Sequence, residues 1–200
     1  MSNMFFNLNH FVVVDVEGNG QTPQEIVELS IVPITKGIIE SPKSWLIKPK
    51  RKVTERAYKI HGISNQDLAN SFSREDITSE VRAALGTSVV VGHNVAIDTG
   101  LIRNHFGDWS PEAILDTIKL AKYVNSELDS YSLDSLIKEY KLDSSPYSRH
   151  RASGDAQLTA QLFITLISYL KDSQHNLLTL SQISGSRDDP FIENKQGTLF

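Results

Sequence analysis

The chain has 200 residues, enough for one globular domain with a substantial core and a short appendage. Its 40% hydrophobic and 22% charged residues are typical of a soluble protein, and no apolar run approaches the roughly 20 residues of a membrane helix. The absence of cysteine excludes disulfides, thiolate metal sites and a cysteine nucleophile. Because the N-terminus also lacks the basic region of a signal peptide, we expect a cytoplasmic protein with no membrane partner.

The formal net charge of −4 weakly disfavours a large basic surface for nucleic acid. Four carboxylates in one metal site would account for that whole excess, so the net charge does not exclude a nucleic-acid partner. Residues 43–59 are locally basic, with seven Lys and Arg against a single Glu. Such a run is either a solvated loop or a path for phosphates.

Hydrophobic periodicity predicts an α/β fold, a five-stranded mixed sheet flanked by helices. The predicted strands are 12–17, 25–34, 37–47, 89–91 and 113–115, and the first three form an antiparallel meander. The predicted helices are 56–60, 73–85, 96–106, 117 to about 123, 132–140, 152–170 and a short one at 177–183. We expect one domain over residues 1–172 and a C-terminal extension over 173–200, with a polar, flexible tail from Ser184 onward.

Asp15 and Glu17 lie near the end of the first predicted strand, in the sequence FVVVDVEGNG. Side chains two apart on a strand point to the same side, so these carboxylates are roughly 7 Å apart along the backbone. Burying two like charges is costly unless a positive charge lies between them, and a divalent cation is the usual solution. Taken alone, the pair could equally be two solvated acids at a strand end.

Two further acids lie near the starts of predicted helices. Asp98 lies in the first turn of the helix after the strand 89–91, and Asp155 lies near the start of the longest helix, five positions after His150. Asp and Glu without cysteine prefer hard ions such as Mg²⁺ or Mn²⁺, and a metal pair can activate water and stabilise the leaving oxygen of a phosphodiester. His150, with an ordinary pKa of about 6.5, could accept the proton of that water, whereas Arg149 and Arg151 beside it could be solvated loop residues.

These motifs resemble those of the DEDDh 3′-to-5′ exonucleases, over residues 11 to about 170. VVVDVEGNG, VVGHNVAID and HRASGDAQLTAQLF resemble the three family motifs in the family's order, and HGIS and YSLDSL fit two secondary signatures. The third is the most specific, because His-x-Ala-x-x-Asp before an apolar helix fixes both a base and a ligand. The resemblance implies a ribonuclease-H-like exonuclease fold.

The resemblance also implies a role for each acid. Asp15 would bridge two Mg²⁺ ions, for which Mn²⁺ could substitute. Glu17 and Asp155 would hold the metal that activates water, and Asp98 would act on the second metal, partly through water. His150 would be the general base.

For the substrate, the resemblance implies a cradle for the 3′-terminal nucleotide made by His61, Asn94 and backbone groups near Val16 and Gly18. His61 could instead satisfy carbonyls at a helix end. Where the family often has Thr-Thr-Gly the chain has Gly-Asn-Gly, and Ile97 stands where an aromatic is common. We therefore expect catalysis to be retained, whereas these two departures leave the substrate preference open.

The chain ends in QGTLF, in which Gln196, Leu199 and Phe200 resemble the peptide that docks replication and repair proteins on the bacterial sliding clamp. We hypothesise that this tail tethers the domain to a clamp, with a reach of roughly 20 Å.

The sequence thus predicts a Mg²⁺-dependent 3′-to-5′ exonuclease that releases nucleoside 5′-monophosphates from single-stranded DNA or DNA 3′ ends. An exoribonuclease is one alternative, because discrimination of the 2′-hydroxyl is not readable from these motifs. A non-catalytic structural subunit of a replication or repair assembly is another.

Overall fold

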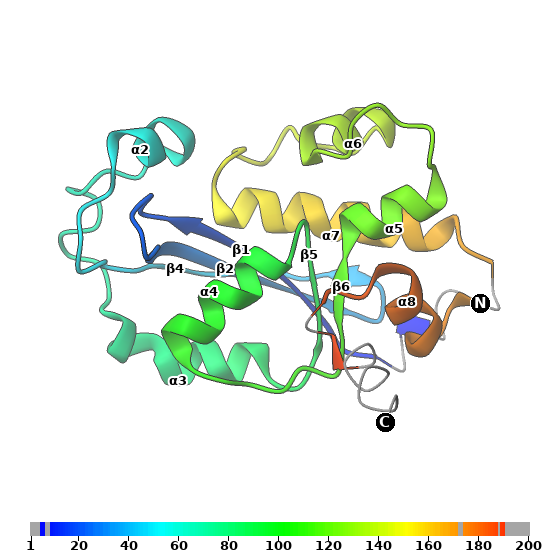
Figure 1. The fold of residues 1–200 in the computed structure, drawn as a ribbon, viewed down its shortest axis with the longest axis horizontal. Helices are drawn as coiled ribbons and strands as arrows, with labels where there is room; N and C mark the ends of the chain where they lie inside the picture. Colours follow the sequence, from blue (N-terminus) through cyan, green and yellow to red (C-terminus); the bar gives the residue numbers. More distant parts are fainter. Residues whose placement is uncertain (1–4, 7–8, 172–173, 188, 191–200) are drawn as a thin grey trace, which may run out of the picture.

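The structure is a computed structural model that describes residues 5–6, 9–171, 174–187 and 189–190. One mixed sheet lies between two layers of helices (Figure 1). Its strands are β1 (Phe11–Gly18), β2 (Ile26–Thr35), β3 (Ile38–Ile39), β4 (Lys43–Leu46), β5 (Val89–Gly92) and β6 (Ile114–Asp116). The helices described are α2 (Glu55–His61), α3 (Arg74–Leu85), α4 (Ala96–Phe106), α5 (Thr117–Val124), α6 (Leu133–Glu139), α7 (Ala152–Ser168) and α8 (Leu177–Ser184).

β1 is the central strand, and its β-branched run is buried on both faces. Phe11 and Val13 pack with α5, α6 and α7, whereas Val12 and Val14 pack on the other face with α3 and α4. The sheet order is β3-β2-β1-β5-β6, with β2 antiparallel to β1 and with β5 and β6 parallel to it. Because parallel strands end at the same edge, the carboxyl ends of β1 and β5 come together there.

The sheet has six strands where the sequence predicts five. The predicted strand 37–47 is divided into β3 and β4, which pair with different parts of β2. Pro42 lies between them and has no N–H to donate to the ladder, so the strand cannot continue through it. The α/β fold class itself is confirmed.

Side-chain caps explain several helix starts. Ser132 Oγ accepts the N–H of Ser135 at 3.3 Å at the start of α6, and Asp116 Oδ1 accepts the N–H of Ile118 at 2.8 Å at the start of α5. α7 has no capping bond from its own N-cap residue Arg151, and another part of the chain supplies one.

The C-terminal segment differs from the prediction of a flexible tail from Ser184. Where it is described, over 184–187 and 189–190, it packs on β6: the N–H of Ser186 donates to Ile114 O at 2.8 Å, and the N–H of Ile114 donates to Asp189 Oδ2 at 2.8 Å. Asp189 is fully buried. The segment thus provides hydrogen-bond partners for the backbone of Ile114 on the edge of β6. The polar sequence of the segment does not reveal this pairing.

Gln196, Leu199 and Phe200, on which the clamp hypothesis depends, lie outside the described residues. Within the part of the chain that the structure describes, no helix is both long and apolar enough to cross a membrane.

Candidate active site

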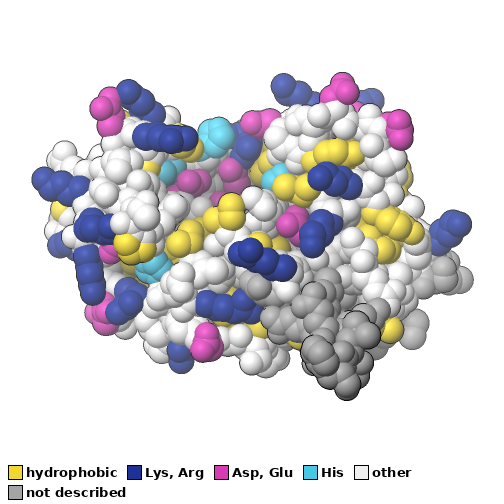
Figure 2. All heavy atoms as spheres, in the orientation of Figure 1, with side chains coloured by type: hydrophobic (Ala, Val, Ile, Leu, Met, Phe, Trp, Pro, Cys, Tyr) yellow, Lys and Arg dark blue, Asp and Glu magenta, His cyan; other side chains and the backbone are white. Residues whose placement is uncertain are grey.

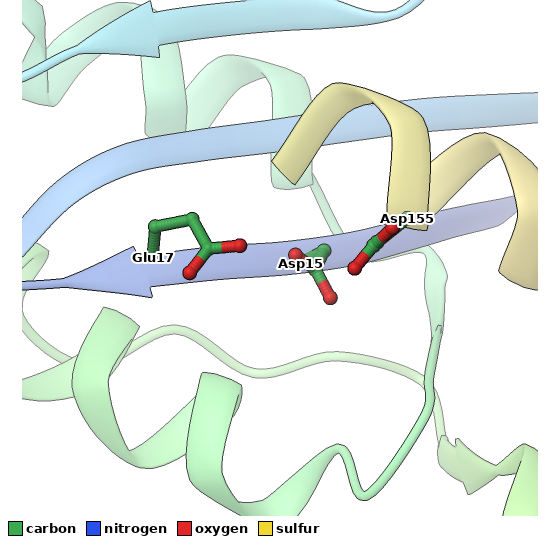
Figure 3. A group of neighbouring side chains, drawn as sticks. All are labelled: Asp15, Glu17 and Asp155. Atoms are coloured by element: carbon green, nitrogen blue, oxygen red, sulfur yellow. The ribbon is translucent and has the colours of Figure 1, made fainter. Parts of the chain in front are cut away.

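Three of the predicted acids come together at the end of β1. Asp15 and Glu17 project from the strand, and Asp155 faces them from the first turn of α7 (Figure 3). One carboxylate oxygen of each lies within 4.8 Å of the others. Oxygen atoms at this spacing can share one hard cation.

Asp98 approaches the same strand from α4. It is 7% exposed, and its Oδ1 accepts the backbone N–H of Val16 at 3.1 Å. The carboxylate is therefore fixed at the residue between Asp15 and Glu17, although Asp98 is not one of the three acids whose oxygens converge within 4.8 Å.

The carboxylates of the cluster repel one another in surroundings of low dielectric constant. Burial, then Asp98 and Glu17, hold the pKa of Asp15 well above its usual range. Burial, followed by Glu28 and Asp98, raises the pKa of Glu17 to about 8, and burial raises the pKa of Asp98 to about 7. The site thus lacks the positive charge that its ionised form requires, and its hard oxygen donors fit a divalent cation such as Mg²⁺ or Mn²⁺.

Arg149 supplies part of the missing charge. Its Nη1 contacts Asp155 Oδ1, and its Nε donates to Asp134 Oδ1 of α6 at 2.7 Å. The sequence leaves open whether this arginine is merely solvated. In the structure its guanidinium bridges α6 and the acidic cluster.

Glu28 and Arg151 form a second charged group beside the cluster. Glu28 lies opposite Glu17 in the pairing of β2 with β1 and is 4% exposed. Arg151 donates to both of its carboxylate oxygens, at 3.0 and 2.6 Å, and the N–H of Ala152 donates to Oε2 at 2.9 Å. This contact caps α7 and so fixes Asp155 relative to β1.

Sequence reasoning missed Glu28, although a signal exists: it is the single acid of the largely apolar strand β2, IVELSIVPIT, which is buried on both faces. Such an acid needs a partner. Its partner is 123 residues away and cannot be identified from one sequence.

His150 lies at the rim of the site. Its backbone has a left-handed φ of 59°, and its N–H donates to Asp155 Oδ2 at 3.3 Å. The imidazole is exposed, and no hydrogen bond joins it to a carboxylate of the described residues. The backbone of the predicted base is therefore tied to the cluster, while its ring is open to solvent.

The predicted substrate residues divide into two groups. His61 is 5% exposed, with Nδ1 accepting the N–H of Ile63 at 3.0 Å and Nε2 lying 3.2 Å from Gly18 O. Since Nδ1 accepts, Nε2 carries the proton, and burial lowers the pKa of the ring. Asn94 instead is exposed, with φ 63°, and its N–H donates to Asp116 Oδ1 at 3.2 Å.

A cavity of about 340 Å³ adjoins the acidic cluster at Glu17. Its walls are the loop between β1 and β2 on one side and α2 on the other, and include Gly18, Gln24, Arg56 and His61. Figure 2 shows acidic side chains in a hollow between α2 and the α6–α7 side, with Lys and Arg gathered over α2 and the left flank. This charge distribution suits an anionic polymer that approaches a cation-binding site.

The model of the exonuclease family matches residues 12–163. The chain therefore belongs to this exonuclease family, and the family resemblance inferred from its motifs is confirmed.

Particular relatives include the PolC-type DNA polymerase III of Thermotoga petrophila, which is 34% identical over 206 residues, covering 94% of this chain and 15% of that protein. The 3′-5′ exonuclease DinG of Bacillus subtilis is 30% identical over 172 residues, covering 82% of this chain and 18% of that protein. The chain thus spans less than a fifth of these curated relatives.

Among solved structures, exonuclease X in complex with 5′ overhanging duplex DNA is 27% identical, with a TM-score of 0.69, and the match covers 87% of this chain and 97% of that chain. The nuclease domain of 3′hExo, a DEDDh family member bound to rAMP, is 13% identical with a TM-score of 0.68 over 80% of this chain and 92% of that one. At 13% identity, the similarity to 3′hExo shows a shared fold and nothing more.

Proposed function

We propose that the chain removes nucleoside 5′-monophosphates from DNA 3′ ends with Mg²⁺ as its cofactor, two ions to a site. The observation that carries this proposal is the convergence of Asp15, Glu17 and Asp155 within 4.8 Å, without enough positive charge to balance them. DNA is favoured because a DNA polymerase is among the relatives, and because the solved structure of exonuclease X is a complex with duplex DNA.

Asp15, Glu17 and Asp155 would hold the ions, and Asp98 would hold the second ion from the α4 side. When bound, the ions supply an activated water and stabilise the leaving oxygen. Mn²⁺ should substitute, because it takes the same oxygen ligands.

In the hydrolysis, the water oxygen forms a bond to phosphorus while the bond between phosphorus and the 3′-oxygen breaks. An imidazole nitrogen of His150 accepts the proton of the water, and the 3′-oxygen leaves with a proton from solvent. The exposed position of His150 lets its ring return that proton to solvent before the next cycle. Its backbone bond to Asp155 keeps the ring beside the cluster.

Val16, Gly18, His61 and Asn94 would cradle the 3′-terminal nucleotide. In this proposal His61 acts by positioning, since both ring nitrogens are engaged with the backbone. Its Nε2–H donates a hydrogen bond to the Gly18 carbonyl and so fixes the backbone conformation next to Glu17.

The first test is degradation of a 5′-labelled single-stranded DNA with Mg²⁺, alongside RNA of the same sequence. The native chain should give a ladder that shortens from the 3′ end, and His150→Ala and Asp155→Ala should abolish it. Glu80→Gln, an exposed acid on α3, is the matched control. Faster shortening of the RNA would make the chain an exoribonuclease, and no cleavage of either strand would favour a structural subunit.

We also propose that residues 173–200 form an extension of the 1–172 domain that docks on the sliding clamp through Gln196, Leu199 and Phe200. We propose a cytoplasmic location as well. Both proposals rest on the sequence alone. Deletion of residues 196–200 should abolish binding to purified clamp, and unchanged binding would refute it.

A further inference from the structure

The loop from Asn19 to Glu25, which joins β1 to β2, is held in one shape by buried contacts. Asn19 is fully buried, and its Oδ1 accepts the N–H groups of Gln21 at 3.1 Å and Glu25 at 3.0 Å. Arg51 pairs with Glu25 at 3.1 Å and donates to Thr22 O at 2.9 Å. A surface loop that is fixed in this way can present a side chain at a defined position.

Gln24 is the side chain that this loop presents beside the active site. It is exposed, and its carboxamide has no hydrogen-bond partner among the described residues. By contrast, the carboxamide of Gln21 donates to Lys52 O at 2.9 Å. Gln24 therefore has two donors and one acceptor available in the cavity that begins at Glu17.

The Gln24 side chain lies over Gly18. A β-carbon on Gly18 would lie 1.7 Å from Gln24 Nε2 and 2.5 Å from its Cδ. Gly18 does not have a positive φ, so its backbone conformation does not require glycine. Glycine is instead needed here because it has no side chain to collide with Gln24. The carboxamide thus occupies the position that a larger side chain at residue 18 would take.

We propose that Gln24 hydrogen-bonds the nucleobase edge of the 3′-terminal nucleotide and sets the base preference of the exonuclease, an inference that rests on the proposed function. The scissile phosphate must lie at Glu17, and its nucleotide must occupy the adjoining space. The cavity of about 340 Å³ there suits a nucleobase. A carboxamide matches the paired donors and acceptors of base edges, as it does in direct readout of nucleic acids.

Arg56 supports this assignment. It lines the same cavity from α2, so the cavity holds a cation as well as the carboxamide. A nucleotide there would meet both a base-reading group and a phosphate-binding group.

The test measures kcat/KM on single-stranded DNA with each of the four bases at the 3′ end, and on DNA with an abasic 3′-terminal nucleotide. Gln24→Ala should lower kcat/KM about tenfold on the preferred natural end, flatten the ranking of the four bases, and leave the abasic end unchanged. Gln66→Ala, an exposed glutamine outside this cavity, is the matched control.

An equal loss on natural and abasic ends would overturn the proposal, because it would mean a contact to the sugar or phosphate, or a structural role. No loss on any end would also overturn it. If the native chain degrades nothing, the proposed function fails instead, so the two failures are distinguishable.

A second variant tests the packing on Gly18. Gly18→Ala should displace the carboxamide and flatten the base ranking as Gln24→Ala does, and the double variant should behave like either single variant. Additive losses, or an intact ranking in Gly18→Ala, would contradict the inferred arrangement.

Discussion

Glu17 and Glu28 lie opposite each other on β1 and β2, yet their surroundings differ. Glu28 receives two hydrogen bonds from Arg151 and one from the backbone of Ala152. Glu17 instead adjoins Asp15 and Asp155, and Arg149 reaches only the last of the three. The comparison indicates that Arg151 neutralises the charge of Glu28, whereas the charge of Glu17 requires an external cation.

The largest expected effect is loss of activity in Asp15→Asn. The amide keeps the shape of the side chain but removes a cation ligand from the centre of the cluster, so kcat/KM should fall by roughly 10³-fold. The fold should remain, because the neutral amide relieves repulsion among buried acids. Exonuclease assays with circular dichroism check both parts, and full activity in this variant would remove Asp15 from the site.

Glu28→Gln should act mainly on stability. It leaves the guanidinium of Arg151 without its charged partner, which should lower the free energy of unfolding by about 2 kcal/mol, since Arg151 is partly exposed. For a chain of this size the melting temperature should drop by roughly 4–8 °C. If activity were lost with no change in melting temperature, Glu28 would belong with the cation ligands instead.

The stability of the metal-free chain should depend on pH. The pKa of Glu17 is raised to about 8 and that of Asp15 is also raised, so the folded state retains protons that the unfolded state releases. Stability should therefore fall as pH rises from about 4.5 through about 8, a loss that Mg²⁺ should reverse. Thermal melts with EDTA and with Mg²⁺ measure this, Glu17→Gln should flatten the slope, and a flat native profile would contradict it.

Arg149→Gln should have the smallest effect. Its guanidinium neutralises part of Asp155, so its removal should lower the Mg²⁺ concentration for half-maximal activity by about threefold. Lys138→Gln on α6 is the control. If Arg149→Gln instead needed more Mg²⁺, the ion pair with Asp134 would be positioning the loop before α7. That role would then outweigh the competition between Arg149 and Mg²⁺ for Asp155.

Much of the fold was readable from the sequence because its signals are local. The β-branched run predicts β1, and the apolar period predicts α4 with the same bounds that the structure has, 96–106. Pro42 marks the break between β3 and β4, and this breaker within the predicted strand 37–47 is a local signal that sequence reasoning missed.

The contacts that organise the site are not local, and one sequence does not reveal them. Arg151 lies 123 residues from Glu28, and Asp189 lies 75 residues from Ile114, whose N–H it accepts. The sequence predicts Asp15, Glu17, Asp98 and Asp155 as one set because motif order links them, and the structure brings Asp15, Glu17 and Asp155 together. The position of Gln24 over Gly18 depends on the shape of a loop, which spacing does not predict.

The most direct test of the central claim is calorimetry of Mg²⁺ binding at pH 7 in buffers of different ionisation enthalpy. Because the cation displaces protons from carboxyls whose pKa is raised, as for Glu17 at about 8, binding should release protons, and the release should disappear above about pH 9. The apparent enthalpy should therefore vary with the buffer at pH 7. Mg²⁺ binding whose heat is independent of the buffer, or no Mg²⁺ binding, would contradict the account.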